Sequence, residues 1–229
     1  MKHRLLLAAS SLFLATAVHA GIPVEEDITC PVGGETFTIV STMSCSSMGA
    51  TMSLRPITSC DFVTRLPVCP SNGLPLFKDF PADEVARPER YVQTPDYAAL
   101  RDLAPALRAY HVAKFLGDET GHERLWLLID AALYDAPAFR SDPANLDLLL
   151  AEATATGDKL HADQRAHVFA IIAYQLALAG LDDEARSWMS DAVRVSDDDE
   201  FFASYRRALE QCIGQMSSEA CAPDTPFSP

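Results

Sequence analysis

Residues 169–197 read FAIIAYQLALAGLDDEARSWMSDAVRVSD, and this stretch decides the fold class of the chain. Apolar residues recur at helical spacing on both sides of Gly180. The pattern predicts one helix over about residues 162–179 and a second from residue 182 or 183 to about 195. Because a short connection makes consecutive helices antiparallel neighbours, the stretch predicts a helical hairpin.

Alanine, leucine and charged residues at helical spacing continue on both sides of this hairpin, from about Pro88 to Gly214. The pattern predicts about seven helices, which together form a stack of antiparallel helical hairpins. The expected starts are Pro95 after the cap Thr94, Pro105, the cap Thr120, Asp142-Pro143, Ala162, Asp182 or Asp183, and the aspartates at 197–199. Residues 91–214 are therefore interpreted as one helical region, and residues 215–229 as a C-terminal tail.

Residues 21–90 have a different composition, rich in Thr, Ser, Gly and Pro, with short β-branched or aromatic runs. The run Glu35–Val40 alternates in polarity, which predicts a strand, and Asp61–Leu66 is a second expected strand. A region this short and rich in turns buries little apolar area, so covalent cross-links are expected to stabilise it. The expected fold class is mainly α, with a small β and loop region preceding the helical hairpins.

All six cysteines lie after residue 20: Cys30, Cys45, Cys60, Cys69, Cys212 and Cys221. An even number of cysteines in an oxidising compartment favours disulfides over free thiols. Their positions favour one pair near the end of the chain and two pairs among the four early cysteines, but they leave the pairing among those four open. A disulfide-exchange protein is a weaker interpretation, because the sequence contains no Cys-x-x-Cys motif.

The first twenty residues have the three parts of a secretory signal peptide. A basic start, Lys2-His3-Arg4, precedes an apolar run over residues 5–18, and Val18-His19-Ala20 offers small residues at the cleavage site. The apolar run is shorter than the roughly 20 residues of a spanning helix. We therefore expect residues 1–20 to be removed and the protein to be periplasmic or secreted; an uncleaved membrane anchor is the alternative.

The chain is acidic, with 18 Lys and Arg against 32 Asp and Glu and a net charge of −14. Nucleic acids and anionic lipid surfaces are bound chiefly through Lys and Arg. We therefore expect no nucleic-acid partner, and no membrane insertion after the signal peptide is cleaved. A basic partner would complement this charge better than an acidic one.

The pair of helices over residues 169–197 resembles a tetratricopeptide repeat. Ala173, Ala185 and Ala192 stand where such repeats place small residues, so that two helices can approach closely. The large apolar positions are held by Phe169, Ile172, Leu176 and Met189. Two positions differ from such repeats. Asp182 stands where a tyrosine is common, and Asp197 stands where the repeat usually ends with a proline. A second, weaker pair covers residues 107–134, and a generic helical bundle is the alternative interpretation.

Two segments of the early region resemble the metal-binding turns of a zinc ribbon. They are Thr29–Phe37, which reads TCPVGGETF, and Leu66–Gly73, which reads LPVCPSNG. Bacterial proteins of the domain-of-unknown-function 2225 type join two such turns to tetratricopeptide-like helices, and most of the chain after residue 20 resembles that arrangement. Gly33 and Asn72 stand where the second cysteine of each turn would be.

The missing cysteines change the chemistry that this resemblance implies. A structural zinc needs four nitrogen or sulfur ligands, and each turn keeps one. The resemblance therefore implies a disulfide-linked, zinc-ribbon-like region without a metal or cofactor. The implied pairs are Cys30–Cys69, Cys45–Cys60 nested inside it, and Cys212–Cys221. A zinc site formed by Cys30, Cys45, Cys60 and Cys69 is the alternative.

The sequence contains none of the catalytic motifs that we sought. It has no Gly-x-Ser-x-Gly, no phosphate-binding loop and no dinucleotide fingerprint. The histidines after residue 20 are His111, His122, His161 and His167, and they form no His-Glu-x-x-His motif. The acidic run at 197–200 lacks the spacing of a calcium loop and is better explained as a helix cap. No catalytic residue is predicted.

We expect an exported, non-catalytic protein-binding or scaffolding protein of the cell envelope. Stacked helical hairpins have a concave face that can hold an extended peptide or a partner helix. The alternative is an enzyme or enzyme accessory with a site between the early region and the helical region. Tyr91, His111 and His122 are the candidate polar groups for such a site.

Overall fold

The computed structural model describes residues 21–117, 121–197 and 199–229. The expected signal peptide over residues 1–20 and the expected cap Thr120 lie outside the described residues. About half of the structure is helical, and the rest includes two small antiparallel sheets and three disulfides. The expectation of a mainly helical chain with a small β and loop region is confirmed.

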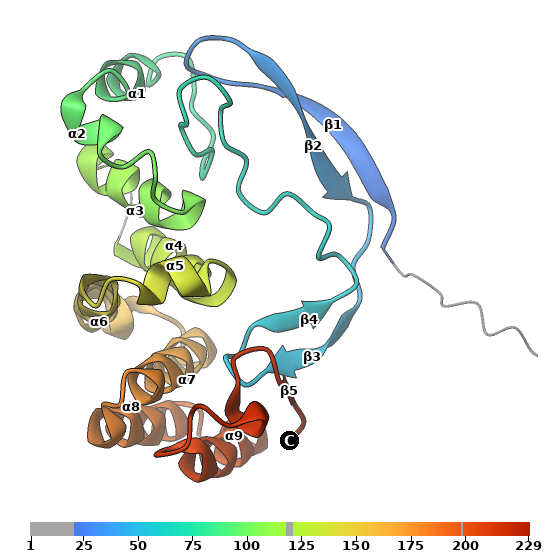
Figure 1. Ribbon diagram of the computed structural model, residues 1–229, viewed down its shortest axis with the longest axis vertical. Coiled ribbons are helices and arrows are strands. Elements are labelled where there is room, and N and C mark those ends of the chain that lie inside the picture. Colours follow the sequence, from blue (N-terminus) through green and yellow to red (C-terminus); the bar gives the residue numbers. More distant parts are fainter. Residues whose placement is uncertain (1–20, 118–120, 198) are drawn as a thin grey trace, which may run out of the picture.

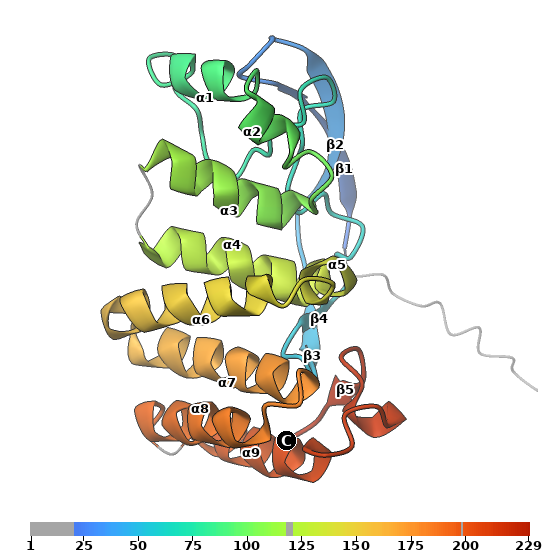
Figure 2. The ribbon, with the colours of Figure 1, turned by 60° about the vertical axis from the view of Figure 1, so that its left-hand side comes forward.

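The helices stack one after another into an arc, which Figures 1 and 2 show from two sides. They are α1 (Ala86–Tyr91), α2 (Pro95–Ala98), α3 (Pro105–Leu116), α4 (Gly121–Tyr134), α5 (Ala136–Arg140), α6 (Ala144–Thr156), α7 (Ala162–Leu178), α8 (Asp182–Val195) and α9 (Glu200–Cys212). All seven expected helices occur in it. The two short helices α1 and α5, which contain Pro88 and Pro137, were not expected. Both prolines lie in a first turn, where the missing N–H has no helical partner in any case.

Local signals explain where several of these helices begin and end. The Thr94 side chain accepts a hydrogen bond from the Tyr97 N–H and caps α2, and the Asp199 side chain caps α9 in the same way through Phe201. Gly117 and Gly180 follow α3 and α7 with φ angles of 68° and 76°. Glycine is the residue that adopts this left-handed conformation without strain, so both positions end their helices.

Helices α7 and α8 pack closely against each other as a hairpin. Ala173, Ala185 and Ala192 are fully buried between the two helices, and their small side chains allow the backbones to approach. The rings of Phe169 and Trp188 meet edge to face, with their centroids 4.8 Å apart. The sequence prediction of this hairpin, including its turn at Gly180, is therefore confirmed.

The strands belong to two separate sheets. Strands β1 (Pro23–Thr29) and β2 (Thr36–Thr42) form an antiparallel hairpin, whereas β3 (Ser47–Thr51) lies between β4 (Pro56–Thr58) and β5 (Pro226–Phe227). The strand expected near residues 35–40 is β2. The strand expected over Asp61–Leu66 is wrong, because these residues form turns and bends. Thr64 instead exchanges two hydrogen bonds with Val40, one through its backbone N–H and one through its side chain.

Residues 21–76, which we call the strap, run along the concave side of the arc and contact both of its ends (Figure 1). At one end, four residues of the strap are buried against α1, α2 and α3: Cys30, Val32, Cys69 and Leu74. At the other end, Met52 and Leu54 join the main core, together with Tyr205 of α9 and Phe227 of β5. Most of the buried apolar residues of the strap therefore belong to cores that it shares with the helices.

The three disulfides are Cys30–Cys69, Cys45–Cys60 and Cys212–Cys221, the pairs that the resemblance implied. Because the sulfur atoms of the four early cysteines are bonded in pairs, they are not the thiolates that the alternative zinc site requires. Three disulfides suggest an oxidising environment. Within the described part of the chain, no helix combines the length and the apolar composition needed to span a membrane.

Candidate functional site

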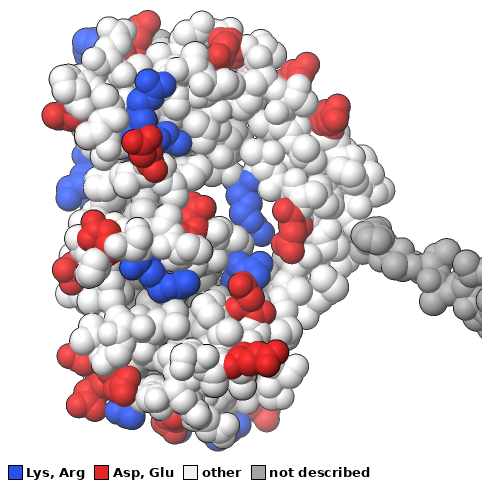
Figure 3. All heavy atoms as spheres, viewed as in Figure 1, with Lys and Arg blue, Asp and Glu red and all other residues white. Residues whose placement is uncertain are grey.

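A cleft of about 790 Å³ opens between the strap and helices α3 and α4. Figure 3 shows the molecule hollowed here, with basic and acidic atoms around the opening. Seven polar residues line this cleft: Arg55, Asp61, Thr64, Arg65, Asp130, Tyr134 and Asp135. Its apolar wall includes Val63, Leu66, Leu76, Phe77 and Leu127. This cleft thus lies between the early region and the helical region.

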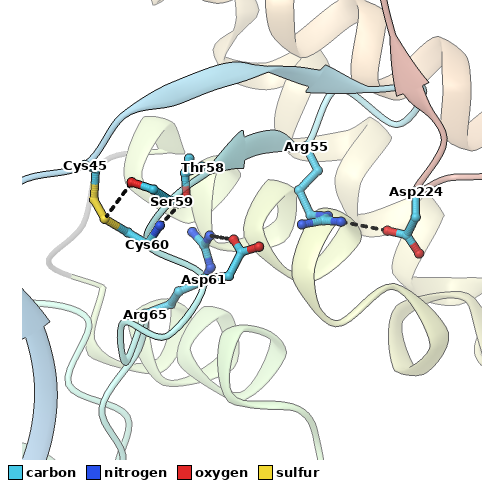
Figure 4. A network of polar contacts seen from close by, with 8 residues as sticks. All are labelled: Cys45, Arg55, Thr58, Ser59, Cys60, Asp61, Arg65 and Asp224. Carbon is cyan, nitrogen blue, oxygen red and sulfur yellow. Dashed lines mark hydrogen bonds and ion pairs between the residues drawn. A yellow bond between two sulfur atoms is a disulfide. The ribbon is translucent and has the colours of Figure 1, made fainter. Parts of the chain in front are cut away.

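The strap brings two arginines into the cleft, and each pairs with an aspartate (Figure 4). Arg55 lies 2.8 Å from Asp224, and Arg65 lies 3.8 Å from Asp61. The side chain of Arg55 is 23% exposed, whereas that of Asp224 is 82% exposed. Exposed ion pairs of this kind contribute little to stability, so a ligand can replace the aspartates at small cost.

The conformation of Leu54 and the disulfide Cys45–Cys60 position these two arginines. Leu54 is fully buried and has a φ angle of 64°, in a tight turn where its N–H donates to the Thr51 carbonyl. This turn precedes Arg55 and β4. The disulfide ties Cys60, at the start of the segment that carries Arg65, to the connection between β2 and β3.

The opposite wall of the cleft is formed by the end of α4. Asp130 and Tyr134 are four residues apart, which places them on the same side of the helix. The Arg65 guanidinium carbon lies 3.6 Å from the centroid of the Tyr134 ring, a cation–π contact that joins the strap to the arc. The two walls therefore touch at this point, and the remaining charged groups surround the contact.

Both carboxylates of the helical wall have a raised pKa. Asp130 is open to solvent inside the cleft, but the surrounding walls displace enough water to raise its pKa, and nearby Asp135 adds to this effect while Arg65 opposes it. Burial likewise raises the pKa of Asp135, opposed by a hydrogen bond from the Ala106 N–H. Since Ala104, the residue before α3, offers no side-chain cap, Asp135 caps that helix from a neighbouring element.

Burial also raises the pKa of the Tyr134 hydroxyl, partly offset by the nearby charge of Arg65. The lining contains no histidine, cysteine or serine. Within the described residues, no group of three or more His, Cys, Asp or Glu side chains is arranged to hold a metal ion. The cleft therefore offers paired charges, the aromatic rings of Phe77 and Tyr134, the Thr64 hydroxyl and apolar surface.

The structure does not bring Tyr91, His111 and His122 into this cleft. Tyr91 stacks on Phe115 with ring centroids 3.7 Å apart, and the ring of His111 meets that of Tyr110. Burial lowers the pKa of His111, with a further contribution from Lys114.

The other histidines also have local contacts. His122 accepts a hydrogen bond from the indole N–H of Trp126, and the His161 side chain takes part in the capping box of α7. Burial lowers the pKa of His167, which is half-buried. None of these residues lines the cleft.

The residues that line the cleft were not among those indicated by the sequence motifs. Asp130 and Tyr134 carry a weak local signal, because two polar residues at helical spacing follow the apolar stripe of α4. Arg55 and Arg65 carry no such signal, because their positions in space depend on how the strap packs against the arc. The β-branched and aromatic residues of the segment 61–66 indicated a strand instead.

The turns at Cys30 and Cys69 have matching hydrogen bonds. The Cys30 N–H donates to the Glu35 carbonyl and the Gly34 N–H donates to the Cys30 carbonyl. In the second turn, the Cys69 N–H donates to the Leu74 carbonyl, and the Gly73 N–H donates to the Cys69 carbonyl. The two turns thus have the same local geometry, and the disulfide joins them at equivalent positions.

Asn72 links the two turns through its side-chain amide. Its nitrogen donates to the Val32 carbonyl at 2.8 Å, and its oxygen accepts from the Leu74 N–H at 2.8 Å. Gly33 faces the same side chain, since a Cβ at Gly33 would lie 3.9 Å from the Asn72 amide nitrogen. The two positions that lack cysteine are therefore neighbours in space, next to the Cys30–Cys69 bond.

No family model matches the chain, and comparisons with curated proteins and with solved structures give no significant match.

Proposed function

We propose that the chain is an exported, non-catalytic protein-binding or scaffolding protein of the cell envelope, and that its partner binds in the cleft between the strap and the arc. The observation that carries this proposal is the cleft itself, which combines two arginines, three aspartates and a continuous apolar wall. An extended polypeptide presents both charged side chains and apolar ones at short intervals. It is therefore the class of ligand that can use both parts of this surface.

Two features of the cleft favour exchange of its own contacts for those of a partner. Asp61 and Asp224 pair with the arginines from exposed positions, so a carboxylate of the partner can take their place. Asp130 has a raised pKa and forms no hydrogen bond or ion pair among those found in the described residues, so a basic side chain of the partner would relieve its unfavourable ionisation.

The proposal extends to the origin of two parts of the fold, the α7–α8 hairpin and the two cysteine turns. We propose that α7–α8 is a tetratricopeptide-like hairpin and that the two cysteine turns derive from a zinc-ribbon-like module, as in the domain-of-unknown-function 2225 type. The buried alanines of α7 and α8 support the first part. The matching hydrogen bonds of the Cys30 and Cys69 turns support the second. A periplasmic or secreted location agrees with the three disulfides.

Site-specific photo-crosslinking tests the proposed binding surface. A photoreactive amino acid at Val63 or Leu127 in the cleft is expected to form adducts with a partner in cells. The same group at Phe115, an apolar side chain that is 45% exposed outside the cleft, serves as the matched control. Adducts that persist in Arg65→Ala and Asp130→Asn backgrounds, or that form equally from Phe115, would contradict the proposal.

The second candidate function is an enzyme or enzyme accessory, because the cleft lies between the two regions where this alternative requires a site. Asp130 and Tyr134 are the groups that could donate or accept protons there, since the pKa of each is raised. Hydrolysis of peptide or glycoside substrates that disappears in Asp130→Asn would favour this candidate over binding. Equal turnover by the variant would exclude Asp130 from catalysis.

A further inference from the structure

A second pocket, of about 400 Å³, lies among α5, the start of α6 and the end of α7. The short helix α5 separates it from the cleft: Tyr134 and Asp135 before this helix line the cleft, whereas Phe139 and Arg140 at its end line the second pocket. Its volume is within the range of sites that hold a small ligand or an inserted side chain.

Gln175 lines this pocket with a side chain whose polar atoms are unsatisfied. The residue is 3% exposed, and neither its amide oxygen nor its amide nitrogen has a hydrogen-bond partner within the described structure. Neighbouring buried polar groups are satisfied: Asn145 donates to the Phe139 carbonyl at 2.9 Å, and Tyr174 donates to the Cys221 carbonyl at 2.7 Å. An unpaired amide in a buried site is unfavourable, and by turning its side chain toward the pocket Gln175 would reach a ligand that supplies both an acceptor and a donor.

The remaining walls define the chemistry of that ligand. Phe139, Leu146, Leu178 and Leu181 make the pocket mainly apolar. A pure hydrocarbon would fill it but would leave the amide unpaired. A peptide backbone offers a C=O for the amide N–H and an N–H for the amide oxygen, while its side chain enters the apolar pocket.

The rim of the pocket adds a preference of charge. Asp142 and Asp147 are exposed there and no ion pair holds either of them among the described residues, whereas Arg140 is the one basic residue of the lining. Two carboxylates against one guanidinium favour a basic side chain next to the inserted one.

We propose that this pocket binds an extended peptide, in which an apolar side chain fills the space beside Phe139 and Leu178, the backbone pairs with the Gln175 amide, and an adjacent basic side chain meets Asp142 and Asp147. The site is separate from the cleft and does not depend on the function proposed for it.

The test uses the full disulfide-bonded chain and the capped tetrapeptide acetyl-Ala-Leu-Lys-Ala-amide. Nuclear magnetic resonance follows the side-chain amide signal of Gln175, which is assigned by its loss in Gln175→Met. The peptide is expected to shift this signal, and Gln175→Met, which keeps the length of the side chain but has no amide, is expected to weaken binding by about tenfold or more. Replacing Lys by Glu, or methylating the leucine nitrogen, is also expected to weaken it.

Two further variants and one control ligand, n-hexanol, make the outcome decisive. Gln211→Met on the exposed face of α9 is expected to bind as the unmodified chain does. Leu181→Glu changes a side chain that is 41% exposed at the pocket, so it blocks binding without disturbing the core if Gln175→Met fails to fold. Absence of any shift at millimolar peptide, unchanged binding by Gln175→Met or Leu181→Glu, or equal binding of n-hexanol would overturn the proposal.

Discussion

The Tyr205 hydroxyl donates a hydrogen bond to the backbone carbonyl of Met52, which lies 153 residues earlier in the chain. Tyr205 is fully buried, and burial raises its pKa well above the ordinary value of a tyrosine. The same ring packs edge to face against Phe227 of β5. One side chain of α9 therefore joins the strap and the C-terminal strand to the end of the arc.

Tyr205→Phe is expected to lower the free energy of unfolding by about 1–3 kcal/mol, because it leaves the buried Met52 carbonyl without its donor while the ring packing remains. Urea unfolding followed by circular dichroism measures this loss. Tyr91→Phe is the matched control, since no hydrogen bond from the Tyr91 hydroxyl occurs among the described residues. A loss as large in the control would show that the Met52 contact is not the cause.

The two disulfides at the ends of the fold are expected to differ in their contribution. Cys30 and Cys69 are 39 residues apart in the sequence, whereas Cys212 and Cys221 are 9 residues apart. The chain-entropy relation gives about 4 kcal/mol for the longer loop and about 2.6 kcal/mol for the shorter one. Unfolding of the two paired Cys→Ala variants in urea should show this order, and the reverse order would mean that native packing outweighs loop closure.

Asp130→Asn is expected to raise the thermal midpoint at pH 7. The pKa of Asp130 is raised in the folded protein, so the folded state favours the neutral carboxyl and its ionisation is destabilising. The neutral amide removes this penalty. The gain should vanish below about pH 4, where the carboxyl is protonated in the unfolded chain as well.

Melting curves from pH 3 to pH 8 test this dependence. Asp191→Asn is the control, because it breaks only the exposed 2.8 Å ion pair with Arg194 on α8 and is expected to give no gain. A gain by Asp130→Asn that is independent of pH would refute the assignment to ionisation.

Gly121→Ala is expected to destabilise the fold, since the new Cβ would clash with the Thr156 γ-methyl. Overpacking of this kind costs about 1–3 kcal/mol. Adding Thr156→Ser should restore most of the loss, because serine removes the methyl and keeps the hydroxyl that donates to the Glu152 carbonyl. Gly157→Ala, whose Cβ would make an ordinary 3.5 Å contact with Phe169, should be tolerated. Failure of the serine to rescue would locate the strain elsewhere.

The helices were predictable from sequence because their signals are local. Pro105 begins α3, Gly117 ends it, and Gly180 ends α7, each through backbone preferences of a single residue. The helix α5 was missed for the same reason: Pro137, taken alone, indicates a break. Its position in a first turn is visible only once the helix is seen.

The strap and the cleft were not predictable, because they depend on pairing between distant residues. Ala50 pairs with Phe227 and Thr51 with Pro226, and a strand of two residues has no periodicity to detect. The contact between Arg65 and Tyr134 exists only after this closure. The candidate residues chosen from sequence, Tyr91 among them, were selected for their chemistry alone and lie elsewhere.

The pairing of β3 with β5 also sets the order in which the molecule is completed. A chain is synthesised from its N-terminus, and 169 residues separate Arg55 from the Asp224 that it contacts. The strap is therefore made long before the elements that receive it. Until β5 arrives, Met52 and Leu54 lack their burial sites, and docking of the strap competes with association between unfinished chains.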